Sequence, residues 1–253
     1  MAHAIHHAFP KCSIVVVESN SERQEWLSAH CSYLKQVSMV DVFSCCQVIF
    51  LAIKPQAVHD LANSTQELIQ NHHCIISMLA GVSQRTLHGL FKPAKIVRIM
   101  PNTPAKLMKG VTGILFDSNS STHEKEWVTR LCQSFGQVIA LGSDDEMNVI
   151  TAISGSGPAF FYRMVESMIR FGESFGLKPA VATQAAIHTI VGAGSMLLDD
   201  PHPADQVKRV ASSKGTTQAG LDMMDLQNFD TIMLTVLNRT YERAVELSKE
   251  APC

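Results

Sequence analysis

Short apolar runs alternate with longer amphipathic segments through the first half of the chain. The runs are rich in β-branched residues and bounded by turn-forming residues, which is typical of strands buried on both faces of a sheet. We predict strands at residues 14–17, 48–53, 75–79, 96–100, 113–116 and 138–141. Helical patterns separate several of them, at residues 22–33, 56–70 and 123–135. This order predicts a doubly wound, Rossmann-like α/β domain, whose usual ligand is a nucleotide at the carboxyl ends of the strands.

After residue 143 the pattern changes, because strand-like runs become rare and apolar residues recur at helical spacing. The predicted helices cover residues 147–153, 159–175, 179–198, 203–211, 216–224 and 229–248. We therefore expect two domains, a Rossmann-like domain over residues 1–143 and an all-α domain over residues 144–253. Residues 179–198 carry no formal charge and are long enough to span a bilayer. Their polar, glycine and alanine content favours a buried helix over a membrane span.

The composition is that of a soluble globular protein of 253 residues, with 46% hydrophobic and 17% charged residues. The net charge of −2 argues against nucleic acid as the main partner, because no basic excess is available to neutralise phosphates. Seven scattered cysteines, without a CxxC pair, indicate reduced thiols. No signal-peptide pattern is evident, so a cytoplasmic protein is expected. The histidines do not cluster at metal-ligand spacing, and we expect no metal site.

Three segments are the most informative about function. They are ISGSGPAFFY at residues 153–162, ASSKGTT at 211–217 and RIMPNTP at 98–104. The first two place Gly, Ser and Thr beside helical patterns, where backbone N–H groups at a helix N-terminus suit a small carboxylate. In their order and spacing the three segments resemble the pyrroline-5-carboxylate reductase family, from residue 1 to about residue 249. The resemblance implies NAD(P)H-dependent reduction of 1-pyrroline-5-carboxylate to L-proline, the last step of proline biosynthesis.

The resemblance also implies where a cofactor would lie in the first domain. Ser19 and Asn20 end the strand beside which the adenosine ribose lies. Their hydroxyl and amide would accept a 2′-phosphate, so NADPH is expected rather than NADH, although Glu18 would repel that phosphate. The other candidate cofactor-binding residues are Ala52, Lys54, Met78, Ala80 and Asn102. Taken alone, Lys54 is an ordinary solvated lysine, and Asn102 before Thr-Pro is equally typical of a turn.

For the substrate, the resemblance implies that the loop at residues 211–217 binds the carboxylate. The residues implied there are Ser212, Gly215, Thr216 and Thr217, with Thr217 as the catalytic partner of the ring nitrogen. A helix N-cap explains the threonines equally well. Asp200 falls near the substrate ring in the family, but Asp199-Asp200-Pro201 is also an ordinary turn. The family usually shows S-P-G-G-x-T, whereas this chain has Ser213 and Lys214 in place of the proline and first glycine. If that glycine requires a positive φ, Lys214 is strained.

The usual glycine-rich turn, G-x-G-x-x-G after a first strand, does not appear in the sequence. Residues 1–5 resemble the helix that follows this turn, and residues 14–17 take the place of the second strand. The first strand is central in a Rossmann sheet, so its flanking strands would lose their shared neighbour. Either the protein begins upstream of this sequence, or the chain is truncated and binds its cofactor poorly.

Two other functions stay open on sequence grounds. One is a cofactor-dead binding or regulatory homologue, suggested by the missing turn and the altered loop. The other is a related imine or β-hydroxyacid reductase. Hydroxyacid enzymes generally use a lysine in the first long helix of the second domain, and residues 159–175 contain none. For the reductase we expect the all-α domain to form a homodimer or larger homo-oligomer through residues 179–198.

Overall fold

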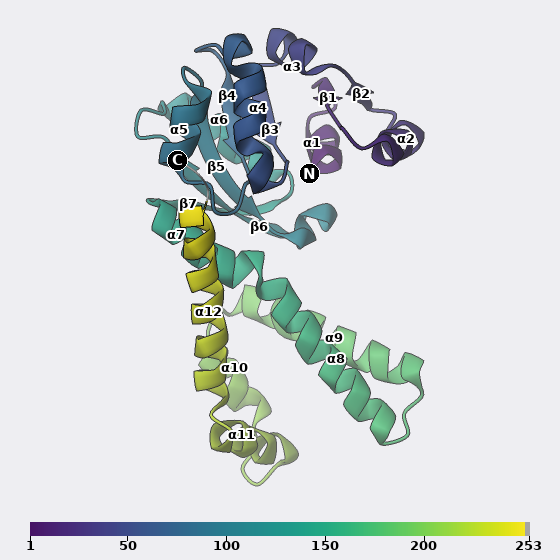
Figure 1. The fold of residues 1–253 in the computed structure, drawn as a ribbon. Helices are drawn as coiled ribbons and strands as arrows, with labels where there is room; N and C mark the ends of the chain where they lie inside the picture. Colours follow the sequence, from purple (N-terminus) through teal and green to yellow (C-terminus); the bar gives the residue numbers. More distant parts are fainter. Residues whose placement is uncertain (251–253) are drawn as a thin grey trace. The chain divides into compact units, whose positions relative to one another are not determined.

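A computed structural model describes residues 1–250, in two compact units (Figure 1). The first unit comprises Met1–Ser156 together with residues 240–250, and the second is Gly157–Arg239. The last three residues of the predicted second domain, 251–253, lie outside the described residues; Cys253 is one of them. The domain boundary predicted after residue 143 stays a prediction, since compactness groups residues 144–156 with the first unit.

The centre of the first unit is a five-stranded sheet with the order β3-β4-β5-β6-β7. Its strands are β3 (Val48–Leu51), β4 (Cys74–Ser77), β5 (Lys95–Pro101), β6 (Gly110–Phe116) and β7 (Gly136–Leu141). All neighbours are parallel except β5 and β6, which pair antiparallel. Ile75 and Ile76 point to opposite faces of β4 and are both fully buried, as a continuous apolar run requires.

Helices cover both faces of this sheet, which confirms the predicted doubly wound fold. On one face, Phe43, Leu87 and Phe91 pack against Ile75; on the other, Phe135 packs near Ile76. The helices of this unit are α1 (Ala2–Ala8), α2 (Ser21–His30), α3 (Met39–Cys45), α4 (Val58–Thr65), α5 (Gln84–Phe91), α6 (Thr122–Gln133) and α7 (Asp144–Ile150). Three short 3₁₀ helices are η1 (Pro55–Ala57), η2 (Gln66–Leu68) and η3 (Thr103–Leu107), and η4 (Thr151–Gly155) is a π-helix.

Side-chain caps explain why several of these helices begin where they do. Ser121 caps α6 in a capping box with Glu124, and Ser38 caps α3 in the same way with Asp41. The sequence patterns missed α3 and α5, which are only 7 and 8 residues long. The single helix predicted over residues 56–70 is instead α4 flanked by η1 and η2, with Pro55 starting the first 3₁₀ turn.

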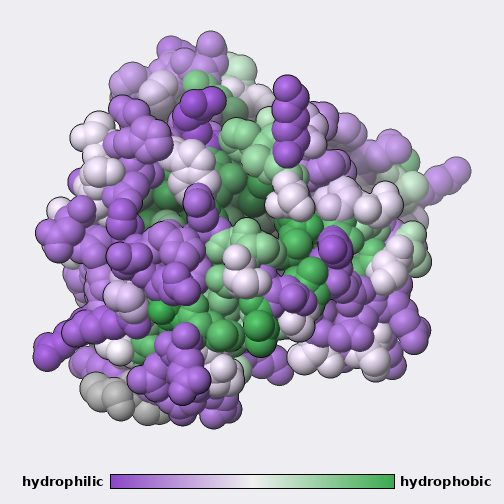
Figure 2. Space-filling view, turned by 90° about the horizontal axis from the view of Figure 1, so that it is seen from above, coloured by the Kyte–Doolittle hydropathy of each residue, from purple (hydrophilic) through white to green (hydrophobic). Residues whose placement is uncertain are grey.

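Strand β1 (Ile14–Val16) does not belong to the main sheet. Within residues 1–250 it pairs only with β2 (Leu34–Gln36), and these two strands of three residues form a sheet of their own. β1 and β3 therefore lack a shared neighbour, as predicted for a sheet without its central strand. All three residues of β1 are only half-buried. Seen from above, the molecule has apolar surface lying open between hydrophilic side chains (Figure 2).

The second unit is all-α, as predicted. Its helices are α8 (Gly157–Ser174), α9 (Pro179–Asp199), α10 (Pro203–Val210), α11 (Thr216–Leu226) and the first part of α12 (Phe229–Glu250). Gly176 has a φ of 87° in the turn that joins α8 to α9, and Pro179 opens α9, which confirms the predicted helix stop and restart. The two helices pack closely at Gly172, where an added Cβ would lie 3.0 Å from that of Ala182.

Within the single chain α9 is largely exposed, so the predicted burial of this helix requires a partner copy. Its buried residues are Ala182 and Ala186, while Val191 and Leu198 are 59% and 88% exposed. A cavity of about 440 Å³ lies between α8 and α9, lined largely by apolar side chains that include Met168 and Phe171. By length and composition α9 would also be able to cross a membrane, and 11% of its apolar window is buried in the chain. In the part of the chain that the structure describes, the apolar side chains on this face of α9 therefore stay open to solvent.

Candidate active site

The adenosine-side candidates follow β1, where a helix cap dominates the local geometry. Asn20 is the N-cap of α2, and its Oδ1 accepts the N–H of Arg23 at 2.9 Å. The N–H of Asn20 donates to Glu18 Oε1 at 3.1 Å, and Arg23 Nε lies 3.5 Å from the other Glu18 oxygen. Asn20 thus has a structural role besides its predicted one. Arg23, whose side chain is 74% exposed, was missed, although an arginine three residues after a strand-end Ser-Asn is a readable signal.

The candidates after β3 and β5 differ in how firmly they are held. Ala52 and Lys54 are exposed, and Lys54 precedes η1. Asn102, in contrast, uses both ends of its amide. Its Nδ2 donates to the Ser154 carbonyl at 3.1 Å, and its Oδ1 accepts the Val111 N–H at 2.9 Å. Asn102 therefore anchors the loop after β5 to β6 and to the segment 153–162, which is more than a turn former does.

Of the two candidates after β4, Ala80 lines a small cavity and Met78 does not. Met78 is half-buried, and its N–H donates to the Leu51 carbonyl of β3 at 3.3 Å. Ala80 and Gly81 border a cavity of about 140 Å³ together with Arg98 of β5. Gly81 has a φ of 75°, a conformation that favours glycine. The carboxyl ends of β3, β4 and β5 thus gather candidates for one nucleotide site, as parallel strands do.

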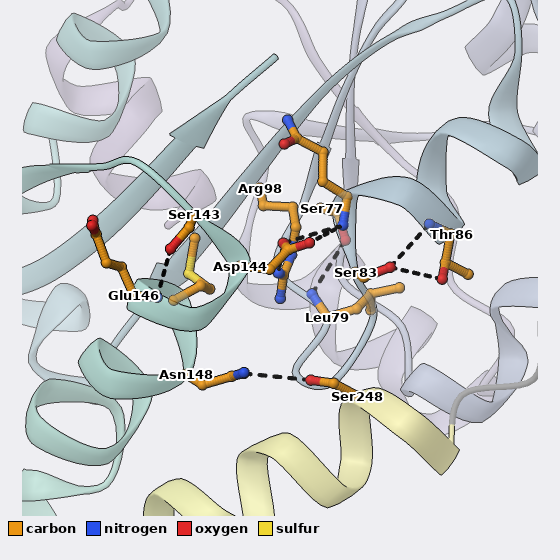
Figure 3. A network of polar contacts seen from close by, with 12 residues as sticks. Ser77, Leu79, Ser83, Thr86, Arg98, Ser143, Asp144, Glu146, Asn148 and Ser248 are labelled. Carbon is orange, nitrogen blue, oxygen red and sulfur yellow. Dashed lines mark hydrogen bonds and ion pairs between the residues drawn. The ribbon is translucent and has the colours of Figure 1, made fainter. Parts of the chain in front are cut away.

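Buried Arg98 is the site feature that the sequence patterns did not assign. Its guanidinium is 3% exposed and pairs with Asp144, the first residue of α7 (Figure 3). Burial lowers the pKa of Arg98, and the Asp144 carboxylate opposes that shift. The two residues are 46 positions apart, so no local pattern predicts their contact.

The substrate candidates form one compact loop of the second unit, between α10 and α11. Gly215 is the N-cap of α11, and its N–H donates to the Ser212 carbonyl at 2.9 Å. An added Cβ on Gly215 would clash with Ser212 Oγ and lie 3.0 Å from the Ser212 carbonyl oxygen, so a side chain there would displace the Ser212 hydroxyl. Thr216 and Thr217 open α11, and no side chain of the described residues caps this helix. Its first-turn N–H groups are therefore available to an anion.

Lys214 has the strained conformation that the comparison with the family motif suggested, with a φ of 61°. A left-handed non-glycine residue costs the folded chain about 1–2 kcal/mol. A glycine in its place would stabilise the unfolded chain by about 0.5–1 kcal/mol through its greater conformational entropy. We therefore expect Lys214→Gly to raise the free energy of unfolding by about 0.5–1 kcal/mol, as measured by urea denaturation. Lys214→Ala is the control, because alanine removes the same side chain but keeps the strain of the left-handed conformation. A Lys214→Gly protein no more stable than Lys214→Ala would contradict the strain.

Asp200 ends α9 with its carboxylate occupied by neighbours of the same unit. It lies 2.6 Å from His202 Nδ1, 3.1 Å from Gln206 Nε2 and 2.8 Å from Arg209 Nη1. These contacts tie the turn after α9 to α10, which supports the turn interpretation. A substrate-binding role for Asp200 stays a prediction.

Each predicted set is thus collected within its own unit, with the cofactor candidates in the first unit and the substrate candidates in the second. The residues fit the two ends of a dinucleotide. Hydroxyl, amide and guanidinium groups suitable for a ribose phosphate follow β1. After β4, Ala80 and Gly81 border the cavity of about 140 Å³. In the described part of the chain, no group of three or more His, Cys, Asp or Glu side chains is arranged to hold a metal ion.

A nucleotide-type sheet followed by a helical unit, with an uncapped helix N-terminus in its loop, is typical of two-domain nicotinamide-dependent oxidoreductases. Residues 144–247 match the family model described as pyrroline-5-carboxylate reductase dimerisation. Residues 1–81 match the model described as NADP oxidoreductase, coenzyme F420-dependent. A pyrroline-5-carboxylate reductase of Pseudomonas aeruginosa is 31% identical over 205 residues, which cover 80% of this chain and 75% of the relative.

Solved structures give the same answer for the fold. The enzyme of Streptococcus pyogenes is 25% identical with a TM-score of 0.86, covering 97% of this chain and 95% of the other. That of Plasmodium falciparum, solved with NADP bound, is 23% identical with a TM-score of 0.84, covering 97% and 94%. The chain belongs to the pyrroline-5-carboxylate reductase family. The predicted family, oxidoreductase class and nicotinamide cofactor are thereby confirmed.

Proposed function

We propose that this chain reduces 1-pyrroline-5-carboxylate to L-proline and that the loop of residues 211–217 holds the substrate. The observation that carries the proposal is the uncapped N-terminus of α11 behind the tight turn from Ser212 to Gly215. N–H groups of a helix N-terminus bind a carboxylate through both hydrogen bonds and the helix dipole. The Ser212 hydroxyl and the Lys214 ammonium add a donor and a positive charge to the same loop.

The reaction needs a proton on the ring nitrogen and a fixed imine carbon. NADPH, when bound, supplies the hydride to that carbon. The Thr217 hydroxyl, one residue into α11, donates to the imine nitrogen and relays a proton from water to it. Thr216 contributes its backbone N–H to the carboxylate. Thr217 is thus the catalytic residue of this scheme, and Ser212, Gly215 and Thr216 bind the substrate, with Asp200 near the ring.

Preference for NADPH follows from the residues after β1. Ser19 and the Asn20 amide offer hydrogen bonds to a 2′-phosphate, and the exposed Arg23 guanidinium offers the charge. Ala52, Lys54, Met78, Ala80 and Asn102 complete the proposed cofactor contacts. NADP is bound in the Plasmodium falciparum relative, which supports the same choice for this chain.

Removing the Arg23 charge should weaken the use of NADPH selectively. We expect Arg23→Ala to lower kcat/KM for NADPH by about 10-fold, the value of one charge-assisted hydrogen bond, and to leave NADH almost unchanged. Initial rates with both cofactors measure this. Arg130→Ala, an equally exposed arginine on α6, is the matched control and should change neither value. Equal losses with both cofactors would show that Arg23 does not contact the 2′-phosphate.

The exposed apolar face of α9 is best explained by a second copy of the chain. The residues that the dimerisation family model matches include the whole helix. Burying this face against its counterpart would remove large apolar side chains from water without a membrane. We therefore place the protein in the cytoplasm as a homodimer or larger homo-oligomer, without a membrane or nucleic-acid partner.

The test is the reaction itself. NADPH oxidation followed by absorbance with 1-pyrroline-5-carboxylate should be matched one to one by proline measured by mass spectrometry. Cofactor binding is measured separately by calorimetry. A protein that binds NADPH but forms no proline would overturn the proposed reaction. A protein that binds the imine acid but no cofactor would instead be a binding homologue.

A further inference from the structure

Arg98 is a buried charge for which neither the proposed cofactor contacts nor the substrate loop accounts. It lies on β5, and Figure 3 shows its guanidinium directed at Asp144. Arginine is costly to bury and is kept in such places when it is paired. The role of Arg98 therefore depends on its partner, Asp144.

Asp144 joins three elements of the first unit through one carboxylate. It pairs with Arg98 of β5, and both its oxygens lie 3.2 Å from the backbone nitrogen of Gln84, the first residue of α5. Asp144 itself begins α7, whose N-cap Ser143 accepts the N–H of Glu146 at 3.1 Å. The negative charge thus faces two helix N-termini and a guanidinium, each of which favours it.

The segment between β4 and α5, residues 78–83, is fixed at both of its ends. At its start Ser77 Oγ accepts the Leu79 N–H at 3.3 Å. At its end the Asp144 carboxylate holds the Gln84 N–H. In the middle, Gly81 lies so close to α12 that an added Cβ would be 2.7 Å from Leu247 Cβ. Arg98 lines the cavity of about 140 Å³ that borders Ala80 and Gly81.

We propose that Arg98 and Asp144 are positioning residues that fix the segment 78–83 and so set the geometry of the nicotinamide side of the active site. The proposal rests on the proposed function, because Met78 and Ala80 of this segment are the candidate contacts there. A displacement of about 1 Å at a reacting centre costs up to about 100-fold in rate. The proposed adenosine contacts follow β1, which belongs to a separate sheet, so we expect binding of that end to change little when the pair is removed.

Two variants and one control test the pair. Asp144→Asn keeps the shape and removes the charge, which leaves the Arg98 charge unpaired. Arg98→Met with Asp144→Asn removes both charges and avoids a buried unpaired one, so it serves if the single variant does not fold. Lys95→Met is the control, because it breaks the exposed Lys95–Glu124 ion pair on the same strand.

Three measurements distinguish positioning from loss of stability. Hydrogen exchange without cofactor, on peptides covering residues 78–84, should rise by about 10-fold or more in the variants, relative to β6 and β7 peptides. Turnover with 1-pyrroline-5-carboxylate should fall by about 10- to 100-fold while KM for NADPH changes by less than about threefold. The isotope effect with NADPH deuterated at the transferred position should change as well, because hydride transfer itself is slowed. Lys95→Met should match the parent in all of these.

Exchange at residues 78–84 that stays at the parent level would overturn the proposal. So would an unchanged isotope effect with a turnover loss that merely follows the folded fraction. The exchange experiment needs no turnover. A parent protein that forms no proline would therefore refute the proposed function, while exchange would still decide whether the pair fixes the segment.

Discussion

Turnover of a Thr217→Val protein should fall by about 30- to 1000-fold. Valine keeps the shape of threonine at the second residue of α11 and deletes the hydroxyl. One lost donor to a developing charge in a water-poor site is worth roughly 2–4 kcal/mol, and each 1.4 kcal/mol is a factor of ten. NADPH affinity should hardly move, because the proposed cofactor contacts belong to the first unit. Steady-state NADPH oxidation and calorimetry with the cofactor measure the two effects.

Thr216→Val is the internal control for this experiment. Thr216 precedes Thr217 in the same helical turn, and its proposed contribution is a backbone N–H that the substitution retains. Its turnover should therefore fall much less. A Thr217→Val enzyme with turnover within about threefold of the parent, below the loss expected for one donor, would remove this hydroxyl from the mechanism and leave the loop as a carboxylate grip.

The second large effect is on assembly. Ile187→Glu on α9 should raise the dissociation constant of the dimer by about 100- to 1000-fold, since an unpaired carboxylate buried at an interface costs about 3–4 kcal/mol. Ile187 is 43% exposed in the single chain, so the substitution should leave the folded monomer intact. Light scattering across a concentration series measures the dissociation constant.

Ile139→Glu is the matched control, because Ile139 of β7 is an isoleucine with a similar exposure of 41% in the first unit. It should assemble like the parent. A stable monomer for the unmodified chain, or equal effects of the two substitutions, would contradict an interface on α9.

Local pattern was sufficient for much of the fold. The β-branched runs predicted β3 to β7 within a few residues, because a strand that is buried on both faces is a nearly continuous run of apolar residues. Gly176 and Pro179 marked the turn between α8 and α9 for a similarly local reason. β2 was missed because Leu34–Gln36 contains a single strongly apolar residue.

The site was predicted less evenly, since side-chain contacts between distant residues leave no local trace. The strain at Lys214 was predictable from the glycine that the family motif carries there. The Arg98–Asp144 pair was not, because 46 residues separate its members. Asn20 and Asp200 were candidate ligands whose side chains also serve helix ends, and sequence alone does not separate these two uses.

The separate β1–β2 ladder makes residues 14–36, where we propose that the adenosine end of the cofactor binds, a region of low stability. Two strands of three residues are marginal in water, and α2, which lies between them in the chain, has no buried residue. Residues 14–36 therefore form a small cooperative unit that opens at much lower free energy than the main sheet. We expect this opening to lower the apparent cofactor affinity, because only the fraction of molecules with an ordered β1–β2 ladder would bind the cofactor. NADPH in turn would act as a folding ligand for this region, so that cofactor supply sets how much of the protein escapes proteolysis there.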